Sequence, residues 1–341
     1  MADTLVEVKH LKEYFNIATG AFTTKPLKAV DDVSFSIRRG ETLGLVGESG
    51  CGKTTVGRTL LHLYKPTAGE IFFEGNKIES KKDILEYRKK SAMVFQDPYS
   101  SLNPRMTVGQ IIGEGLITHK FFKPRDPKMK EYILQIMEEC GLQGYMLHRY
   151  PHQFSGGQRQ RICIARALAV KPKFIVCDEC VSALDVSIQS QIINLLEELK
   201  ENEKLTYLFI SHDLSVVRYI SDRIGVMYLG NLVELGTAEE VFRDPRHPYT
   251  VALLSSIPTT DPDSASKDRI ILEGNIPSPI RPPEGCKFHT RCYMACDKCK
   301  RVPPPYVEVS PGHFVACHFL DKKIDENGNY LFDRNSKKEE K

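Results

Sequence analysis

The sequence predicts an α/β fold with a buried parallel sheet, and two stretches carry that prediction. Residues 42–46, TLGLV, form a short apolar run typical of a strand, and KTTVGRTLLHLY after it has the composition of a helix. In the second stretch, KFIVCDE, four apolar residues from Phe174 to Cys177 precede two acids. Since ligands bind at the carboxyl ends of strands in open α/β sheets, both stretches end where a binding site is expected.

The glycine-rich segment after the first strand has the spacing of a phosphate-binding loop. Gly47, Gly52, Lys53 and Thr54 fit the pattern G-x-x-x-x-G-K-[ST]. Glycines let successive backbone N–H groups converge on phosphate oxygens, and the helix N-terminus adds the positive end of its dipole. We expect Lys53 to reach the β- and γ-phosphates and the Thr54 hydroxyl to coordinate Mg²⁺. The segment therefore predicts a P-loop (RecA-like) nucleoside triphosphatase.

The acids that end the second strand complete this chemistry. We expect Asp178 to hold Mg²⁺, mostly through water, and Glu179 to polarise the attacking water. Four apolar residues followed by Asp-Glu are a weak pattern alone. After a phosphate loop the same pattern is good evidence for the strand that ends beside the magnesium ion.

Composition excludes several classes of protein. The chain has 341 residues, 41% of them hydrophobic and 27% charged, which describes a globular protein of about two domains. The net charge of +3 is too small to predict nucleic-acid binding. The N-terminus lacks the apolar core of a signal peptide, and no apolar run approaches the ~18 residues of a membrane span. We therefore expect a cytoplasmic protein with reduced thiols.

The stretch FSGGQRQRICIARALAV, residues 154–170, resembles the signature motif of ATP-binding-cassette (ABC) ATPases. Other motifs follow in the order of that family: Gln96 in MVFQDP resembles the Q-loop, and SALD, ending at Asp185, resembles the D-loop. His212 in YLFISHDLS resembles the switch histidine. The resemblance implies an ABC nucleotide-binding domain over residues 1–255, with a helical subdomain at about 97–170.

The resemblance also implies roles for residues at the matching positions. The expected catalytic residues are Glu179 as the base, His212, Gln96 and Lys53. The expected ATP-binding residues are Tyr14, Phe15, Gly47, Glu48, Ser49, Gly50, Cys51, Gly52, Lys53, Thr54 and Thr55, with an aromatic ring stacked on adenine. Mg²⁺ is expected on Thr54, Gln96 and Asp178.

A second cassette is implied as a partner. Ser155, Gly156 and Gly157 open a helix whose exposed N–H groups form an anion site. In the family this site faces ATP on the other cassette, so the expected contacts to the partner's ATP come from Ser155, Gly156, Gly157, Gln158 and Asp185. The chain has one phosphate loop and one signature, which implies that two chains form two ATP sites.

One position departs from the family pattern. Proline usually follows the catalytic glutamate, whereas Cys180 follows Glu179 here. Proline would fix φ and stiffen the turn. Cysteine is expected to remove that restraint and to leave an oxidation-sensitive thiol near the γ-phosphate.

Periodicity predicts two helices that pack into the core. In KMKEYILQIMEECG, one face carries Ile133, Ile136, Met137 and Cys140, and Gly141 is placed to end the helix. In VSIQSQIINLLEELKENEK the apolar positions at helical spacing are Ile188, Ile192, Leu195, Leu196 and Leu199. The isolated cysteines are expected to be buried small hydrophobes, namely Cys51, Cys140, Cys163 and Cys177.

The chain beyond the cassette resembles the C-terminal extension of ATPases that power bacterial dipeptide and oligopeptide importers. RHPYTVALLSSIP, EGNIPSPIRPPEGCKFHTRC and VACH carry this resemblance, which is closest to the second of the two ATPase subunits. We expect the extension at 256–333 and a frayed tail at 334–341. The implied partners are a second, unlike ATPase subunit, two transmembrane permease subunits and an extracytoplasmic peptide-binding protein. The implied location is the cytoplasmic face of the membrane.

Two other functions stay open at this stage. One is a soluble ABC ATPase that acts on ribosomes or DNA, and the other is an iron–sulfur redox protein regulated by ATP. The solute is also open, because the membrane subunits and the binding protein choose it, and dipeptides, longer peptides, nickel and sugars are all candidates.

The clustered cysteines of the extension predict a metal centre, since cytoplasmic thiols are rarely paired in disulfides. The resemblance selects Cys286, Cys292, Cys299 and Cys317 as ligands of a [4Fe–4S] cluster, with zinc and reduced thiols as alternatives. Cys296 is an additional candidate, because its spacing to Cys299 is that of a zinc-ribbon pair. The spacing from Cys292 also matches radical S-adenosylmethionine enzymes, but the alternating strands and helices of their barrel are missing.

Overall fold

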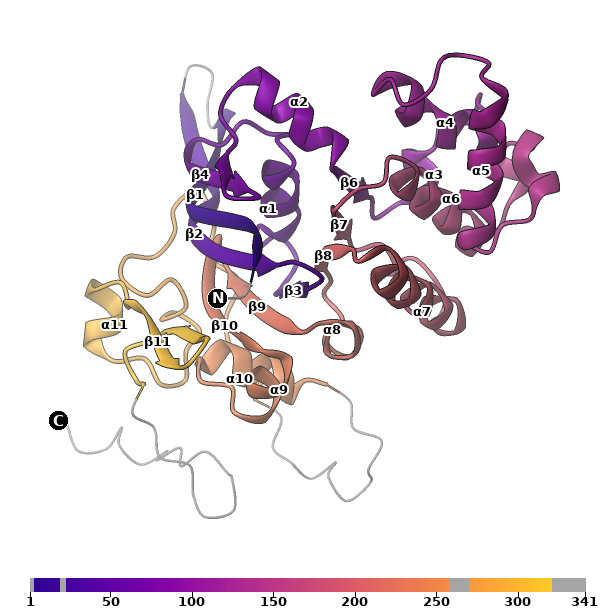
Figure 1. Ribbon diagram of the computed structural model, residues 1–341. Helices are drawn as coiled ribbons and strands as arrows, with labels where there is room; N and C mark the ends of the chain where they lie inside the picture. Colours follow the sequence, from indigo (N-terminus) through magenta and orange to yellow (C-terminus); the bar gives the residue numbers. More distant parts are fainter. Residues whose placement is uncertain (1–2, 19–22, 258–269, 321–341) are drawn as a thin grey trace.

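The fold contains two sheets that meet around the phosphate loop. The computed structural model describes residues 3–18, 23–257 and 270–320 (Figure 1). An antiparallel sheet has, in spatial order, β2 (Thr24–Arg38), β1 (Thr4–Ala18), β4 (Ala68–Phe73) and β5 (Asn76–Lys77). The larger sheet has, in order, β11 (Tyr306–Ser310), β12 (His313–Ala316), β10 (Asn231–Thr237), β9 (Arg223–Tyr228), β3 (Thr42–Val46), β8 (Thr206–Ile210), β7 (Phe174–Asp178) and β6 (Ser91–Val94).

The middle of the larger sheet is parallel and fully buried. β9, β3, β8, β7 and β6 pair in parallel, and every residue of β3, β7, β8 and β9 is buried. Strands covered on both faces have continuous apolar sequences, which is why both strands were recognisable. The predictions of strands at 42–46 and 174–177 are confirmed, and β7 includes one further residue, Asp178.

A helical lobe lies to one side of the sheets (Figure 1). It contains α3 (Pro98–Ser101), α4 (Val108–Thr118), α5 (Pro127–Glu139), the 3₁₀ turns Gly144–His148 and Pro151–Gln153, and α6 (Gly156–Ala169). The predicted face of α5 is confirmed, because Ile133, Ile136, Met137 and Cys140 are all buried. Gly141 follows in the left-handed conformation, with φ of 69°, which ends the helix as expected.

The other helices cover the sheets and connect their strands. They are α1 (Lys53–Leu60), α2 (Lys81–Lys89), α7 (Val186–Glu203), α8 (Leu214–Ile220), α9 (Ala238–Arg243), α10 (Pro248–Ser255) and α11 (Asp297–Arg301). The predicted core positions of α7 are buried except Ile188, which is half-buried. The four isolated cysteines are buried, as predicted. No helix in the described parts of the chain has both the length and the apolar character needed to cross a bilayer.

The C-terminal extension is built onto the cassette instead of standing apart from it. Its hairpin, β11 and β12, joins the larger sheet, with Glu234 of β10 opposite Val315 and Leu235 opposite Phe314. Phe288 is buried among the rings of Tyr228 and Tyr249, with centroid separations of 5.1 and 5.4 Å. Sequence analysis predicted the extension but not this sheet pairing. The tail at 334–341 lies outside the described residues.

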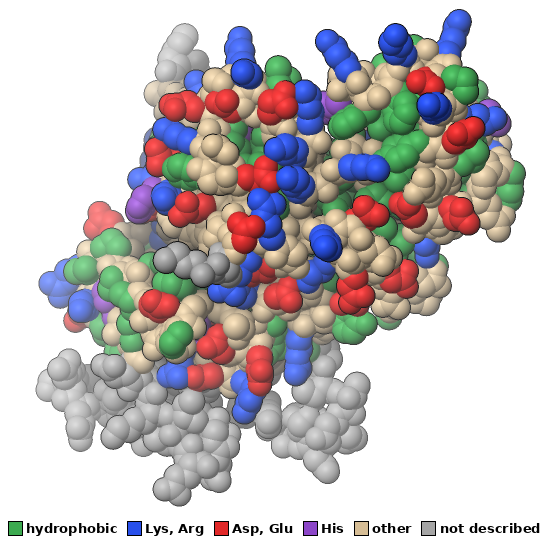
Figure 2. Space-filling view, viewed as in Figure 1, with side chains coloured by type: hydrophobic (Ala, Val, Ile, Leu, Met, Phe, Trp, Pro, Cys, Tyr) green, Lys and Arg blue, Asp and Glu red, His purple; other side chains and the backbone are tan. Residues whose placement is uncertain are grey.

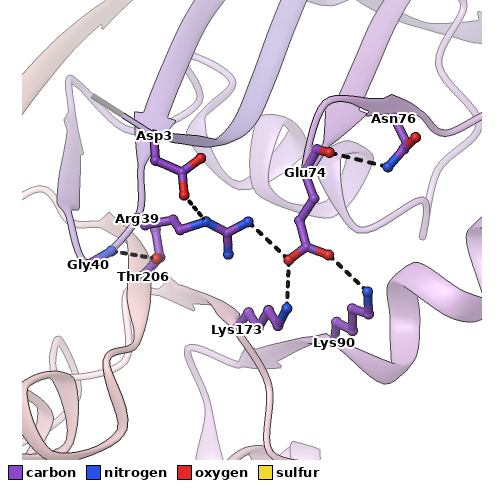
Figure 3. A network of polar contacts seen from close by, with 8 residues as sticks. All are labelled: Asp3, Arg39, Gly40, Glu74, Asn76, Lys90, Lys173 and Thr206. Carbon is purple, nitrogen blue, oxygen red and sulfur yellow. Dashed lines mark hydrogen bonds and ion pairs between the residues drawn. The ribbon is translucent and has the colours of Figure 1, made fainter. Parts of the chain in front are cut away.

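A charged network ties the sheets together at the edge opposite the phosphate loop (Figure 3). Glu74 accepts hydrogen bonds from Lys173 at 2.6 Å, Lys90 at 2.8 Å and Arg39 at 3.1 Å. Lys90 and Lys173 directly precede β6 and β7, so this carboxylate joins the amino ends of parallel strands to the antiparallel sheet. We therefore expect the network to stabilise the fold.

Replacing Glu74 with Gln is expected to lower the free energy of unfolding by about 1–2 kcal/mol at pH 7, allowing for solvent screening. Burial favours protonation of Glu74, but the hydrogen bonds from Lys173, Lys90 and Arg39 outweigh it and lower the pKa from 4.5 to about 2. The wild-type advantage should therefore be complete above pH 4.5 and fade as the pH falls towards 2. Urea unfolding at several pH values measures it.

The control for this experiment is Glu239→Gln, since Glu239 is 73% exposed in its pair with Arg243. That variant should unfold like wild type. Equal stability of the Glu74 and Glu239 variants at pH 7 would show that the network contributes nothing net.

Candidate active site

The phosphate loop positions the Lys53 ammonium between two backbone carbonyls. Lys53 Nζ donates to the oxygens of Gly47 at 2.7 Å and Glu48 at 3.1 Å. Gly47 has φ of 150° and Gly52 has φ of 108°, and a Cβ on either would lie 2.2 Å from a backbone oxygen. Only glycine fits both positions, which explains the spacing that identified the loop.

Two oxygen groups meet beside the loop, one from the first turn of α1 and one from the carboxyl end of β7. Thr54 Oγ1 donates to Asp178 Oδ1 at 2.7 Å, and Asp178 is fully buried. Asp178 Oδ2 has no hydrogen bond from the described residues, and its nearest cation is Arg58 at 3.9 Å. Burial raises the pKa of Asp178. A buried, incompletely satisfied carboxylate beside a hydroxyl suits Mg²⁺, which prefers oxygen ligands.

Glu179, Gln96 and His212 come together from three different segments. Glu179 Oε2 accepts a hydrogen bond from Gln96 Nε2 at 2.9 Å, and His212 Nδ1 lies 3.3 Å from the same oxygen. Glu179 adopts a left-handed backbone with φ of 46°, which costs a residue other than glycine roughly 1–2 kcal/mol. A strained turn that presents a carboxylate to two polar side chains is typical of a functional site.

The burial of Cys180 bears on the oxidation sensitivity expected of it. Cys180 is only 2% exposed, and Cys177 on the preceding strand β7 is fully buried. Burial keeps both sulfurs away from solvent and, in this conformation, does not favour the expected sensitivity of Cys180 to oxidation. Its expected place near the γ-phosphate stays a prediction.

The signature motif caps α6 as predicted. Ser155 Oγ accepts from the Gln158 N–H at 3.3 Å, while Gln158 Oε1 accepts from the Ser155 N–H at 3.1 Å. α6 lies in the helical lobe, apart from α1, the helix that follows the phosphate loop (Figure 1). Ser155 and Gly156 are exposed, so the start of this helix is open to another molecule.

Gly157 has a second role, which sequence analysis missed. A Cβ at this position would lie 2.5 Å from Ile188 Cγ2 of α7. Ile188 therefore packs against the start of the signature helix. Asp185, three residues earlier, caps α7 by accepting from the Ile188 N–H at 3.0 Å. The D-loop and the signature are thus held together by packing.

The two aromatic candidates for adenine stacking lie on opposite faces of β1, since successive strand residues alternate. The Tyr14 hydroxyl donates to Asp31, whose other carboxylate oxygen accepts from Lys287. Phe15 makes an edge contact with Tyr64 at 5.3 Å between ring centroids. Tyr14 is thus committed to a polar contact, and Phe15 is the better placed of the two for stacking.

Comparison with known families accounts for this arrangement. Residues 30–182 match the ABC transporter family, and residues 233–299 match the family described as oligopeptide/dipeptide transporter, C-terminal region. The oligopeptide transport ATP-binding protein AppF of Bacillus subtilis is 54% identical over 322 residues, which covers 93% of this chain and 97% of AppF. This chain belongs to the ABC transporter ATPases.

Other members of the family agree with this assignment. OppF of Haemophilus influenzae, an oligopeptide transport ATP-binding protein, is 50% identical over 92% of this chain and 97% of its own length. Among solved structures, cbiO1 of Clostridium perfringens, part of the ABC transporter complex cbiONQ, has a TM-score of 0.60 at 28% identity. It covers 71% of this chain and 92% of cbiO1. The dimeric cassette MJ0796 bound to ADP and Pi has a TM-score of 0.61 at 27% identity over 69% of this chain and 99% of that one.

The cysteines of this ABC ATPase do not form a metal site as placed. Across residues 3–18, 23–257 and 270–320, no group of three or more His, Cys, Asp or Glu side chains could hold a metal ion. The sulfurs of Cys296 and Cys299 lie 3.6 Å apart. Burial raises the pKa of Cys286 to about 11, and the neighbouring Cys299 and Cys317 add to the increase. The predicted ligand set of Cys286, Cys292, Cys299 and Cys317 is thus not assembled around one point.

Sequence analysis also missed a contact between the phosphate loop and the extension. Arg291 forms two hydrogen bonds to the Glu48 carboxylate, at 2.6 and 3.0 Å. The Glu48 N–H donates to the Tyr249 hydroxyl at 2.9 Å. No pattern in the sequence links residues 243 positions apart, so this contact had no detectable sequence marker.

Proposed function

We propose that this ABC ATPase hydrolyses ATP to drive the import of oligopeptides or dipeptides. The named relatives, which match over nearly their whole length, and the transporter-type C-terminal region support the substrate class. The observation that carries hydrolysis is the convergence of Gln96 and His212 on Glu179, beside the pair of Thr54 and Asp178. Gln96, Asp178 with Glu179, and His212 follow the carboxyl ends of β6, β7 and β8, which are adjacent parallel strands, and a triphosphate would bind at this edge of the sheet.

Each residue has a defined task in this proposal. Lys53 exchanges its carbonyl partners for the β- and γ-phosphates, and Phe15 stacks on adenine. Thr54, Asp178 and Gln96 hold Mg²⁺, which neutralises charge on the phosphates when bound. Glu179 orients the attacking water and accepts its proton, while His212 contacts the γ-phosphate.

The proposed active form is a dimer with a second ABC ATPase subunit. Ser155 and Gly156 are exposed at the start of α6, which lies apart from the helix following the phosphate loop of its own chain (Figure 1). Paired with a second cassette, the signature and Asp185 would face the partner's ATP. The dimeric form of MJ0796 supports such a pairing by likeness.

The helical lobe offers a docking surface for the proposed membrane permeases. A hollow of about 730 Å³ lies among α4, α5 and the turn at 144–148, lined by apolar residues such as Met129 and Ile133 and by polar residues such as Gln110 and Arg125. Figure 2 shows hydrophobic and basic side chains gathered over this lobe, at the upper right. One permease docked here, and the other on the second ATPase subunit, would hold the ATPases at the cytoplasmic face of the membrane, and a peptide-binding protein outside would deliver the solute.

The test is co-expression of the chain with the permeases and second ATPase encoded beside it. Purification by a tag on this chain should recover a membrane complex that takes up labelled peptide in an ATP-dependent manner. Recovery with ribosomes or DNA instead of membrane subunits would favour a soluble ABC ATPase. Nickel- or sugar-dependent uptake would keep the enzyme and replace the substrate.

For the cysteine region we propose a structural [4Fe–4S] cluster that takes no part in hydrolysis. The spacing of Cys286, Cys292, Cys299 and Cys317, with Cys296 as an alternate, supports it. Anaerobic protein should contain about four irons and absorb near 400 nm. Stoichiometric zinc without iron, or metal-free folded protein, would contradict the cluster, and electron transfer by the purified chain would favour a redox function.

A further inference from the structure

The C-terminal extension contacts the phosphate loop itself, through one residue of that loop. All three polar groups of Glu48 are engaged: its N–H with Tyr249, its carbonyl with Lys53 and its carboxylate with Arg291. Two of these three partners lie outside the loop, and Arg291 belongs to the extension. The loop is therefore braced by a segment that follows it in sequence by more than two hundred residues.

Arg291 is held in a fixed position by its surroundings. Its side chain is 7% exposed, and its guanidinium lies over the Tyr228 ring at 5.9 Å from the centroid. Tyr228 in turn packs against Tyr249 and Phe288, with centroid separations of 4.8 and 5.1 Å. A planar guanidinium that binds a carboxylate through two hydrogen bonds fixes orientation as well as distance.

The same short segment has a second contact with the nucleotide-binding part of the cassette. Lys287 Nζ donates to Asp31 Oδ2 at 2.9 Å and to the Leu229 carbonyl at 3.1 Å. Asp31 accepts from the hydroxyl of Tyr14, next to Phe15 on β1. Residues 287–291 thus contact the loop that binds phosphates and also β2, the strand paired with the one that carries the proposed adenine-stacking ring.

The charges of Glu48 and Arg291 indicate how their contact would favour ATP binding. Glu48 places a carboxylate on the loop that must accept a triphosphate, and like charges repel more strongly where solvent is partly excluded. Arg291 neutralises that carboxylate and, through two hydrogen bonds, restricts its movement. Without Arg291 the loop would be less restrained and would also present an unpaired negative charge to ATP.

We propose that Arg291 is a positioning residue for ATP binding, supplied by the extension, which neutralises Glu48 and holds the phosphate loop ready for the triphosphate. The proposal rests on ATP binding at Lys53 and is independent of the transported solute and of any metal in the extension. It predicts that the extension contributes to ATP affinity through Arg291.

The test measures the dissociation constant of Mg·ATP for the full-length chain, with a fluorescent ATP analogue as the probe. Arg291→Ala should weaken binding roughly tenfold, and Arg291→Lys should weaken it less because the charge remains. The decisive variant is the double substitution Arg291→Ala with Glu48→Gln. It should bind more tightly than Arg291→Ala alone, since the unpaired carboxylate is gone. A purely structural role for Arg291 predicts no such recovery.

Two controls separate this proposal from failure of the ATP site or of folding. Lys53→Ala should lose ATP binding whether or not Arg291 matters, and Lys300→Ala, in an exposed pair of the same extension, should bind like wild type. Circular dichroism must show each variant folded. If Arg291→Ala destabilises the extension, Arg291→Lys and the double variant still decide the question. Wild-type affinity of folded Arg291→Ala, or a double variant no tighter than the single one, would overturn the proposal.

Discussion

Glu179→Gln is expected to lower ATP turnover by about 10²–10⁴-fold while leaving ATP binding intact. Glutamine keeps the length and shape of the side chain, and its amide oxygen can still accept the hydrogen bond that Gln96 Nε2 donates at 2.9 Å. The amide cannot take a proton from water, so the chemical step loses its base. The chain should then accumulate in the ATP-bound, closed dimer.

Turnover should be measured in the assembled complex, with the equivalent glutamate of the second ATPase replaced in wild-type and variant samples alike. The remaining rate then comes from the site of this chain. Size-exclusion chromatography with and without Mg·ATP reports the closed dimer. Glu201→Gln is the matched control, since Glu201 is an exposed residue of α7 and its loss should leave turnover unchanged. Unimpaired turnover in Glu179→Gln would remove Glu179 from the role of base.

The central part of this site could be predicted from the sequence because its elements are local and strongly patterned. Buried parallel strands have continuous apolar sequences, and the glycines of the loop have backbone conformations or close contacts that only glycine tolerates. Parallel strands place their carboxyl ends at one edge, so Thr54 and Asp178 could be expected to meet although they are 124 residues apart.

The remaining features depend on side-chain packing between distant segments, which single-sequence patterns do not encode. The hydrophobic spacing of α7 predicted burial but not that Ile188 would press on Gly157. The aromatic pair at 14 and 15 gave no indication of which ring would turn towards Asp31. Cys180 could be expected beside Glu179, but its sequence position did not indicate that its side chain would be buried in the core.

In the cysteine region too, the spacing of residues in the sequence does not determine which side chains come together. The resemblance selected four ligands, yet one of them, Cys299, has its sulfur 3.6 Å from that of Cys296, the residue outside that set. A short helix, α11, places these two thiols one turn apart, so local geometry decides their contact. Cys317 directly follows β12, whose pairing with β10 has no counterpart in cysteine spacing.

Asp178→Asn is expected to affect stability and activity in opposite directions. Asparagine retains an oxygen that can accept from Thr54 Oγ1, so the local hydrogen bond survives. It removes a buried charge whose Oδ2 lacks a hydrogen bond from the described residues. Burying an incompletely compensated charge is costly, and the nucleotide-free variant should gain about 1 kcal/mol in free energy of unfolding. The Mg²⁺ concentration for half-maximal turnover should rise roughly 10- to 100-fold, as for other residues that hold a metal through water.

The pH dependence of the stability gain distinguishes loss of the buried Asp178 charge from a general change in packing. Burial raises the pKa of Asp178 above 3.8, so the folded state binds its proton more tightly than the unfolded state. The penalty is therefore present at neutral pH, where the folded carboxylate is charged, and it disappears below the unfolded pKa of about 3.9. The stability gain of Asp178→Asn should shrink as the pH falls through the raised pKa. Asp297→Asn, at a 73% exposed site, is the control and should show neither effect. The explanation would be contradicted if Asp178→Asn raised the free energy of unfolding equally at all pH values. An unchanged Mg²⁺ requirement would show that the Asp178 carboxylate does not hold the metal.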